Sequence, residues 1–451
     1  MKLIKNAFVL VGRNSEPILQ DVLYDEKIIE IGKDLKVKDC TGIIDLAGKL
    51  LIPGCIDAHV HFNDPGYNRH ETFTTGTAAA AFGGITTVID MPCTSIPPVT
   101  SASHLKEKLA VIERKAYVDF ALWGGIRRND FPLPDTMIDQ LWQEGIVGFK
   151  IYTISGMDTF QALSYADIRE VFCRFPNYLF AFHAEDADII KKATAGLSAA
   201  ELSLPENYPK SRPVTAEIEA VKQILALAKG KHLHFVHVGS ADAAELILQS
   251  QTKEDITWET CPHYLQFTAA DYPVLQGRLK TAPPVKTLRD RDFLRSALCR
   301  GKVDFITTDH AGCDWKTEKD LEDFSQVYNG IPGTQLLIPY LCSEFYQSGL
   351  ITLPTLIRLT SEHPAKRYGL YPRKGTLQPG SDADFTVIDL NKPLRVDETK
   401  LQSIGKYSPF QGKMFGCSIA RTIVRGETVF AAERGILVEP GYGKWLKRKQ
   451  S

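Results

Sequence analysis

The sequence has no excess of charge of either sign and no long apolar run. Its 53 Lys and Arg residues nearly balance 54 Asp and Glu residues, which gives a formal net charge of −1. Because no surplus of positive charge is available to neutralise phosphates, we do not expect nucleic-acid binding as the main activity. No apolar stretch approaches the roughly 20 residues that a membrane-spanning helix needs, so we expect no membrane segment.

Closely spaced cysteines are absent as well. The nine cysteines show no CxxC or CxxxC spacing, which argues against a disulfide framework and against a thiolate zinc site. The first segment contains no cleavage pattern of the A-x-A type, so we expect a cytoplasmic location. The sequence also lacks a G-x-S-x-G motif, a P-loop and a G-x-G-x-x-G motif after a strand. These absences disfavour a serine nucleophile, phosphoryl transfer and dinucleotide redox chemistry.

The sequence does contain a repeated unit, an apolar and β-branched run followed by a helical stretch. Eight runs occur from residue 50 to about residue 311: LLIPGCIDAHVHF, GITTVIDMP, YVDFALWGGI, GIVGFKIY, YLFAFHAED, HLHFVHVGS, ITWETCPHY and VDFITTDHA. Between them, segments such as 101–115 and 215–229 have apolar residues at helical spacing. This pattern predicts an α/β fold, a TIM-like (β/α)8 barrel with outer helices over residues 50–372.

The two ends of the chain differ from this unit. Residues 1–49 and 373–451 contain segments such as FVLVGR and DADFTVIDL. Their alternation of apolar and polar residues is typical of antiparallel strands. We therefore expect both ends to pair into one small β-sandwich beside the barrel. Residues 314–333, after the eighth run, are expected to form an active-site loop.

Candidate metal ligands stand at the ends of five of the eight runs, where barrel enzymes place catalytic groups. In a strand, residues i and i+2 share a face, so His59 and His61 can reach one ion. An isolated H-x-H pair is as readily structural, and the other run ends decide the interpretation. Those ends add Lys150, His183, His237 and Asp309. The six side chains predict a site for two divalent ions, and imidazole ligands suit zinc.

Lys150 needs its own explanation because an ammonium group cannot bind a cation. If carbon dioxide carboxylates its amine, the resulting N6-carboxylysine has two oxygens that can bridge two metals. The alternative is a lysine whose ammonium extends to the barrel mouth. For His183 or His237 taken singly, the alternative is a hydrogen-bonded core histidine. The convergence of all six groups on equivalent strand ends favours the metal site.

The predicted ligands indicate a reaction. Two metals can lower the pKa of a bridging water, so that hydroxide is available near neutral pH, and can polarise a carbonyl oxygen. Asp309 could take the proton of that hydroxide and pass it to a leaving nitrogen. We therefore expect hydrolysis of an amide bond, with Asp309 as general base and acid. His263 is expected to contact the substrate or to support a ligand, and His310, on the opposite face from Asp309, is expected to be structural.

From about residue 50 to residue 425, the chain resembles the cyclic amidohydrolases, which include dihydroorotases, allantoinases and hydantoinases or dihydropyrimidinases. The matching motifs are DAHVHFNDPG, TGTAAAAFGGITTVIDMP, GFK, ETCPHY, TAPPV, TTDHA, GIPG, HPAKRYGL and KGTLQPGSDADFTVIDL. The resemblance implies that His59, His61 and Asp309 bind one metal, that His183 and His237 bind the second, and that carboxylated Lys150 bridges them. It also implies a small cyclic amide or ureide substrate and a homo-oligomer, commonly a tetramer.

Departures from the pattern of each group bear on the substrate. Dihydroorotases usually have an arginine, an asparagine and a histidine that grip the substrate carboxylate, at positions that here are Asn63, Cys93 and Cys313. Hydantoinases usually have a tyrosine at the position of Ser155, although Asn329 resembles part of their substrate loop. Dihydroorotase is therefore disfavoured, and hydantoinase remains an alternative.

Allantoinases resemble the chain more closely, in HFNDPG, in CPHY, in Arg212-Pro213 and in the cysteine at position 313, although DHAG departs from their usual D-H-S-P. We expect an allantoinase-like opening of a hydantoin ring, with a metal-bridging hydroxide as nucleophile. The expected substrate contacts are Asn63, Cys93, Ser155, His263, Ala282, Cys313 and Asn329. A catalytically silent scaffold protein is the alternative from another class. It would be expected to lack one or more ligands, and all six are present.

Overall fold

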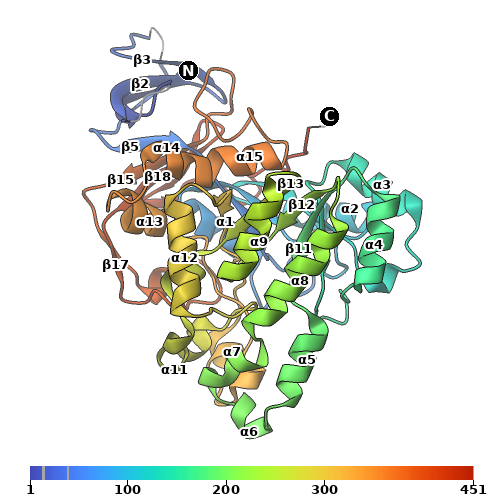
Figure 1. The fold of residues 1–451 in the computed structure, drawn as a ribbon. Helices are drawn as coiled ribbons and strands as arrows, with labels where there is room; N and C mark the ends of the chain where they lie inside the picture. The colour runs from blue at the N-terminus through green and yellow to red at the C-terminus, as the bar shows by residue number, and fades with distance from the viewer. Residues whose placement is uncertain (13–15, 38–39, 450–451) are drawn as a thin grey trace.

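A computed structural model describes residues 1–12, 16–37 and 40–449 (Figure 1). The fold is an α/β arrangement, as predicted, and its parallel strands coincide with the eight apolar runs. These strands are β6 (Cys55–Val60), β7 (Ile85–Asp90), β8 (Asp119–Leu122), β9 (Gly124–Gly125), β10 (Phe149–Tyr152), β11 (Leu179–His183), β12 (His232–Phe235), β13 (Asp255–Thr260) and β14 (Phe305–Ile306). Nearly all of their residues are buried, which explains why most of the runs are largely apolar rather than alternating.

The parallel strands form two sheets that are linked at their edges. One sheet has the order β6-β7-β8, and the other has the order β14-β13-β12-β11-β10-β9. At the outer edges, Val60 forms a parallel bridge with His310, and the amide of His61 donates to the carbonyl of His310 (2.8 Å). Because all of these pairings are parallel, the carboxyl ends of the strands lie at the same edge.

Helices follow the strands along the chain. The predicted helical segments 101–115 and 215–229 overlap α2 (Ala102–Ile112) and α8 (Val214–Leu227), which confirms both. The Ser101 hydroxyl accepts a hydrogen bond from the amide of His104 and so caps the start of α2. The other helices of nine or more residues are α1 (Phe73–Phe82), α3 (Asp135–Glu144), α4 (Tyr165–Arg174), α5 (Ala187–Ala195), α9 (Ala241–Gln251) and α12 (Leu288–Cys299). In the described part of the chain, no helix has both the length and the apolar character needed to cross a membrane.

Strands from both chain ends form a separate mixed sheet of nine strands. Its order is β20-β19-β18-β15-β5-β1-β2-β3, with β4 paired to β1. The strands are β1 (Lys2–Val9), β2 (Ile18–Tyr24), β3 (Ile28–Gly32), β4 (Gly42–Asp45), β5 (Leu50–Pro53), β15 (Phe385–Asp389), β18 (Ser418–Val424), β19 (Glu427–Ala431) and β20 (Gly435–Ile436). In Figure 1, β2 and β3 lie at the top, and α5, α6 (Ala199–Leu202) and α7 (Tyr208–Ser211) lie at the bottom. The antiparallel pair β5–β15 joins the N-terminal and C-terminal strands directly.

The first apolar run divides at Gly54 instead of forming one strand. Strand β5 pairs with β1 and β15 in the sheet of the chain ends, whereas β6 pairs with β7. A Cβ atom at Gly54 would lie 2.2 Å from Oγ1 of Thr86 and 2.7 Å from Cβ of Asp384. No side chain fits where the backbone passes between the two sheets. The sequence pattern did not separate the halves because both are apolar.

A buried cluster of charges joins the C-terminal part of the chain to β8. Nζ of Lys374 lies 2.7 Å from Asp119 Oδ2, 2.6 Å from Asp384 Oδ2 and 3.1 Å from Asp382 Oδ2. Nη2 of Arg425 lies 3.2 Å from Asp119 Oδ1. Burial alone would lower the pKa of Lys374, but the three carboxylates outweigh it and raise this pKa above its ordinary value. The ammonium therefore stays charged and holds the three carboxylates together.

Lys374→Met is expected to lower the free energy of unfolding by about 3–5 kcal/mol, because it leaves buried carboxylates without their cation. Lys366→Met is the matched control, since it removes a largely exposed i,i+4 pair with Glu362, which is worth at most about 0.5 kcal/mol. Urea unfolding followed by circular dichroism compares the two variants. Equal midpoints for K374M and K366M would contradict a stabilising role for the cluster.

Candidate metal centre

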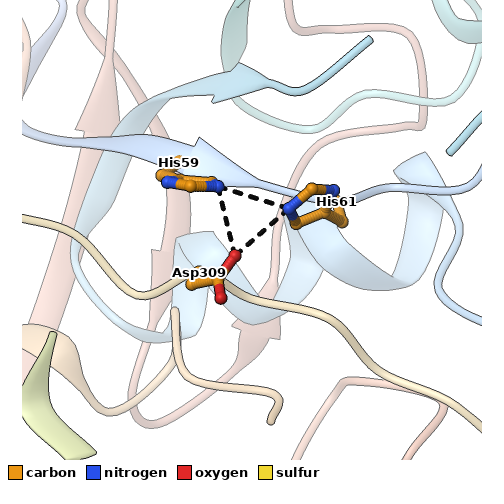
Figure 2. Close-up of side chains that lie close together, drawn as sticks. All are labelled: His59, His61 and Asp309. Carbon is orange, nitrogen blue, oxygen red and sulfur yellow. Dashed lines mark hydrogen bonds and ion pairs between the residues drawn. The ribbon is translucent and has the colours of Figure 1, made fainter. Parts of the chain in front are cut away.

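Two histidines and an aspartate meet at the carboxyl edge of the parallel strands (Figure 2). His59 belongs to β6, His61 follows that strand directly, and Asp309 follows β14. The Nε2 atoms of the two histidines lie 3.3 Å apart, and each lies 3.1 Å from Oδ1 of Asp309. Their ligand atoms all fall within 4.8 Å of one another. This cluster could hold a metal ion, because three side chains of the types that bind metals bring their ligand atoms together.

His183 and His237 face each other beside this cluster. Nδ1 of His183 lies 3.1 Å from Nε2 of His237, and the ring centroids of His59 and His237 are 5.4 Å apart. Burial lowers the pKa of both His183 and His237, so both rings are neutral at physiological pH. A neutral imidazole has a lone pair for a metal. The structure thus places two further nitrogen donors next to the first group.

Lys150 lies in β10 and is fully buried. Within the described residues, its Nζ has no hydrogen-bond partner. Burial lowers the pKa of Lys150 to about 8, although the negative charge of Asp309 opposes this shift. An unpartnered buried ammonium is costly. The unpartnered amine therefore fits a lysine that carries a further group on Nζ, such as the predicted carboxylate.

Buried carboxylates lie behind two of the histidines. Oε1 of Glu259 lies 2.5 Å from Nδ1 of His59, and its Oε2 lies 3.1 Å from Nε2 of His234. Burial raises the pKa of Glu259, but the two imidazoles outweigh burial and lower this pKa to about 2. Glu185 lies 2.9 Å from Nε2 of His183 and also accepts hydrogen bonds from Arg212. These contacts leave Nε2 of His59 and Nδ1 of His183 as the atoms that face the cluster.

His310, next to Asp309 in the chain, has hydrogen-bond partners outside the cluster. Nε2 of His310 lies 2.8 Å from Oε2 of Glu71, and its Nδ1 lies 3.2 Å from the amide nitrogens of Gly333 and Thr334, which donate to it. Both ring nitrogens are thus engaged away from the cluster. This placement agrees with the structural role expected for His310.

A cavity of about 450 Å³ adjoins the cluster. Its wall contains four of the predicted ligands, His61, His183, His237 and Asp309, and four of the predicted substrate contacts, Cys93, Ser155, Ala282 and Asn329. The other three predicted contacts, Asn63, His263 and Cys313, are buried and are not among the described residues of this wall. Sγ of Cys313 lies 3.4 Å from the hydroxyl of Tyr407 instead.

Several wall residues were not predicted as substrate contacts. Tyr152 places its hydroxyl 3.1 Å from Sγ of Cys93, and Arg212 enters the wall while paired with Glu185. Residues 325–328, inside the predicted active-site loop 314–333, also line the cavity, beside the predicted contact Asn329. The signal for Glu185 was present in the sequence, because it follows His183 at the i+2 spacing that keeps two side chains together.

Comparison with known proteins gives concordant matches. A profile described as the amidohydrolase family matches residues 50–429. An allantoinase of Deinococcus radiodurans is 34% identical over 411 residues, which cover 88% of this chain and 90% of that protein. An L-hydantoinase of Paenarthrobacter aurescens is 35% identical and covers 94% and 93% of the two chains. The solved structure of the L-hydantoinase (dihydropyrimidinase) from Arthrobacter aurescens superposes with a TM-score of 0.93 at 33% identity, with 99% of each chain covered.

Glu259→Gln is expected to weaken metal binding about 10- to 100-fold, because the amide no longer holds the His59 ring as a carboxylate does. Competition with a chromogenic zinc chelator measures this affinity. Glu245→Gln, an exposed position on α9, is the matched control. An affinity of E259Q equal to that of E245Q would contradict the role assigned to Glu259.

Proposed function

The chain belongs to the amidohydrolase family, and we propose that it opens the ring of a hydantoin, with allantoin as its substrate. The observation that carries this proposal is the meeting of His59, His61 and Asp309 with the His183–His237 pair at the edge of one cavity. Such a donor set suits metal-assisted hydrolysis of a carbonyl bond. Relatives named allantoinase and L-hydantoinase support a cyclic amide as the bond that is cleaved.

Two zinc ions are the proposed cofactors. His59, His61 and Asp309 would hold one ion, His183 and His237 would hold the other, and carboxylated Lys150 would bridge the two. The unpartnered Nζ of Lys150 and the facing nitrogen atoms of the histidine pairs fit this arrangement. When bound, such ions lower the pKa of water and polarise a carbonyl oxygen.

Asp309 is the proposed proton carrier. Among the described residues its hydrogen bonds go to Oδ1, from His59 and His61, so Oδ2 remains for a proton. Burial would raise the pKa of Asp309, but the imidazoles outweigh burial and hold this pKa well below its ordinary value. The ionised carboxylate would accept a proton from the attacking water and return it to the ring nitrogen as the amide bond breaks.

The cavity wall favours a substrate ring without a carboxylate. Arg212 is the one arginine of the described wall, and Glu185 binds its guanidinium through two donors. No unpaired guanidinium therefore faces the cavity from the described residues to receive the carboxylate of dihydroorotate. The polar groups that line the cavity, including Ser155 and Asn329, suit the neutral amide and carbonyl groups of a ureide.

A hydantoinase acting on substituted hydantoins is the second candidate. The L-hydantoinase of Paenarthrobacter aurescens matches over 94% of the chain, and the solved structure of the L-hydantoinase from Arthrobacter aurescens superposes over 99% of it. Allantoin and these substrates share the hydantoin ring, so the two candidates differ in the substituent rather than in the chemistry. Measured preference among substituents separates them.

We also propose a domain organisation for this activity. The two linked parallel sheets would form one closed (β/α)8 barrel within residues 50–372, and residues 1–49 and 373–451 would form the sandwich beside it. The bridge between Val60 and His310 supports closure. The pairing of β5 with both β1 and β15 supports a shared sheet of the two ends, which takes in residues 50–53 as well.

The substrate assignment is tested with zinc-loaded, bicarbonate-treated protein. Allantoin, 5-substituted hydantoins, dihydrouracil and dihydroorotate are offered separately, and ring opening is followed by the loss of ultraviolet absorbance or by chromatography. We expect the highest kcat/KM for allantoin and no turnover of dihydroorotate. Preference for a hydantoin with another substituent at position 5 would identify a hydantoinase in place of an allantoinase. No turnover of any cyclic amide would refute the proposed function.

Lys150→Ala is expected to abolish activity and to release metal, because the bridging carbamate cannot form. Short carboxylic acids added to this variant are expected to restore part of both. Metal content by mass spectrometry and turnover are measured together. Lys302→Ala removes an exposed lysine close to β14 and serves as the control. Full activity of K150A would show that Lys150 does not bridge the metals.

A further inference from the structure

Two lysines near the cavity are buried without a carboxylate partner. Lys280 is 2% exposed and Lys319 is 1% exposed. Across the described residues, neither ammonium forms an ion pair with an aspartate or a glutamate. This is unusual, because buried lysines are almost always paired. Lys374 of this chain follows the rule, with three carboxylates within 3.1 Å.

The two ammonium groups bind backbone carbonyls instead. Nζ of Lys280 donates to the carbonyls of Phe324 (2.6 Å), Ser325 (3.3 Å) and Val327 (2.7 Å). Nζ of Lys319 donates to the carbonyls of Tyr328 (2.8 Å), Gly330 (2.8 Å) and Lys280 (3.0 Å). Five of these six acceptors belong to residues 324–330, which we call the cavity loop.

The cavity loop forms one wall of the cavity. Its residues 325–329 line the same space as His61, His183, His237 and Asp309. Phe324 and Val327 are buried, whereas Ser325, Gln326 and Asn329 are exposed. The loop thus turns several carbonyls inward and leaves three polar side chains exposed along the cavity wall.

The inward carbonyls explain why lysine occupies these positions. An ammonium offers three donors, which matches the three acceptors at each site. An apolar side chain would leave the carbonyls of Ser325, Val327 and Tyr328 without a donor among the described residues. Aromatic faces complete the surroundings, since Nζ of Lys280 lies 4.9 Å from the ring centroid of Phe324 and Nζ of Lys319 lies 5.2 Å from that of Tyr407.

The arrangement is costly for the fold. Burial lowers the pKa of Lys280 to about 8 and that of Lys319 to about 7. The charged form of each lysine is therefore held beside the loop at a cost in stability, and shifted pKa values of this kind are common at functional sites. The loop also depends on Tyr407, whose hydroxyl donates to the carbonyl of Gly330 (3.0 Å).

We propose that Lys280 and Lys319 are positioning residues that hold the cavity loop as a preformed wall and thereby set the affinity for the substrate. The proposal rests on the proposed hydrolysis of a cyclic amide at this cavity. A preformed wall removes the cost of ordering the loop when the substrate binds. Loss of either ammonium should weaken substrate binding more than it slows the chemical step, because neither lysine lies among the described residues of the cavity wall.

The test compares Lys319→Met and Lys280→Met in the zinc-loaded enzyme. Methionine approximates the length of lysine but offers no donor. We expect hydrogen exchange of amides 324–330 to become about tenfold faster, KM to rise about tenfold and kcat to change less than about threefold. Tyr407→Phe removes one neutral donor to the same loop and should shift both readouts in the same direction by less. It keeps the test decisive if a lysine variant fails to fold.

Two controls separate positioning from general destabilisation. Lys316→Met alters an exposed lysine of the same segment and should change neither readout. Lys374→Met removes a buried lysine that touches no residue of the cavity loop, and should lower stability without a selective rise in KM. Unchanged exchange in the cavity loop, or equal changes in KM and kcat that match those of K374M, would overturn the proposal. The exchange readout needs no substrate, so it stands even if no cyclic amide is turned over.

Discussion

The hydrogen bond from the amide of His61 to the carbonyl of His310 connects the first and last of the parallel strands. It brings His61 and Asp309, 248 residues apart in the chain, to within 3.1 Å. Asp57 strengthens the same junction, since it accepts the amide (3.1 Å) and the hydroxyl (2.6 Å) of Thr308. Without this junction the cluster of His59, His61 and Asp309 would not exist, whatever its residues were.

Buried acidic groups then decide how the imidazole rings are oriented. Glu259 fixes His59, Glu185 fixes His183, and Glu71 fixes His310. In each pair a carboxylate binds one ring nitrogen, and this contact fixes the direction in which the other ring nitrogen points. For His59 and His183 the free nitrogen faces the cluster, whereas His310 is turned away. The carboxylate that binds each ring therefore decides whether the histidine can face the cluster as a ligand or has a structural role.

The strand ends could be predicted from the sequence because each strand is an apolar run that stops at polar residues. That rule brought out His59, His61, Lys150, His183, His237 and Asp309, and the structure places them on or directly after parallel strands. The path of the loops could not be predicted in this way. Asn63 and Cys313 follow such ends by a few residues, yet both are buried away from the described cavity wall. The roles of Lys280 and Lys319 were hidden for the same reason, because their partners are backbone carbonyls, which leave no mark in the sequence.

Two residues of the site, like five other described residues that are not glycine, have a positive backbone φ. His237 and Asp309 adopt positive φ values of 40° and 51°, which cost of order 1–3 kcal/mol each for residues other than glycine. Both are proposed ligands, and both stand where a parallel strand has just ended. A relaxed backbone would send these side chains in another direction, so the strain is the means of turning them toward the cluster. The surrounding hydrogen bonds must overcome this cost. It follows that the carboxylates and backbone contacts behind the cluster are as necessary to its geometry as the six proposed ligands themselves.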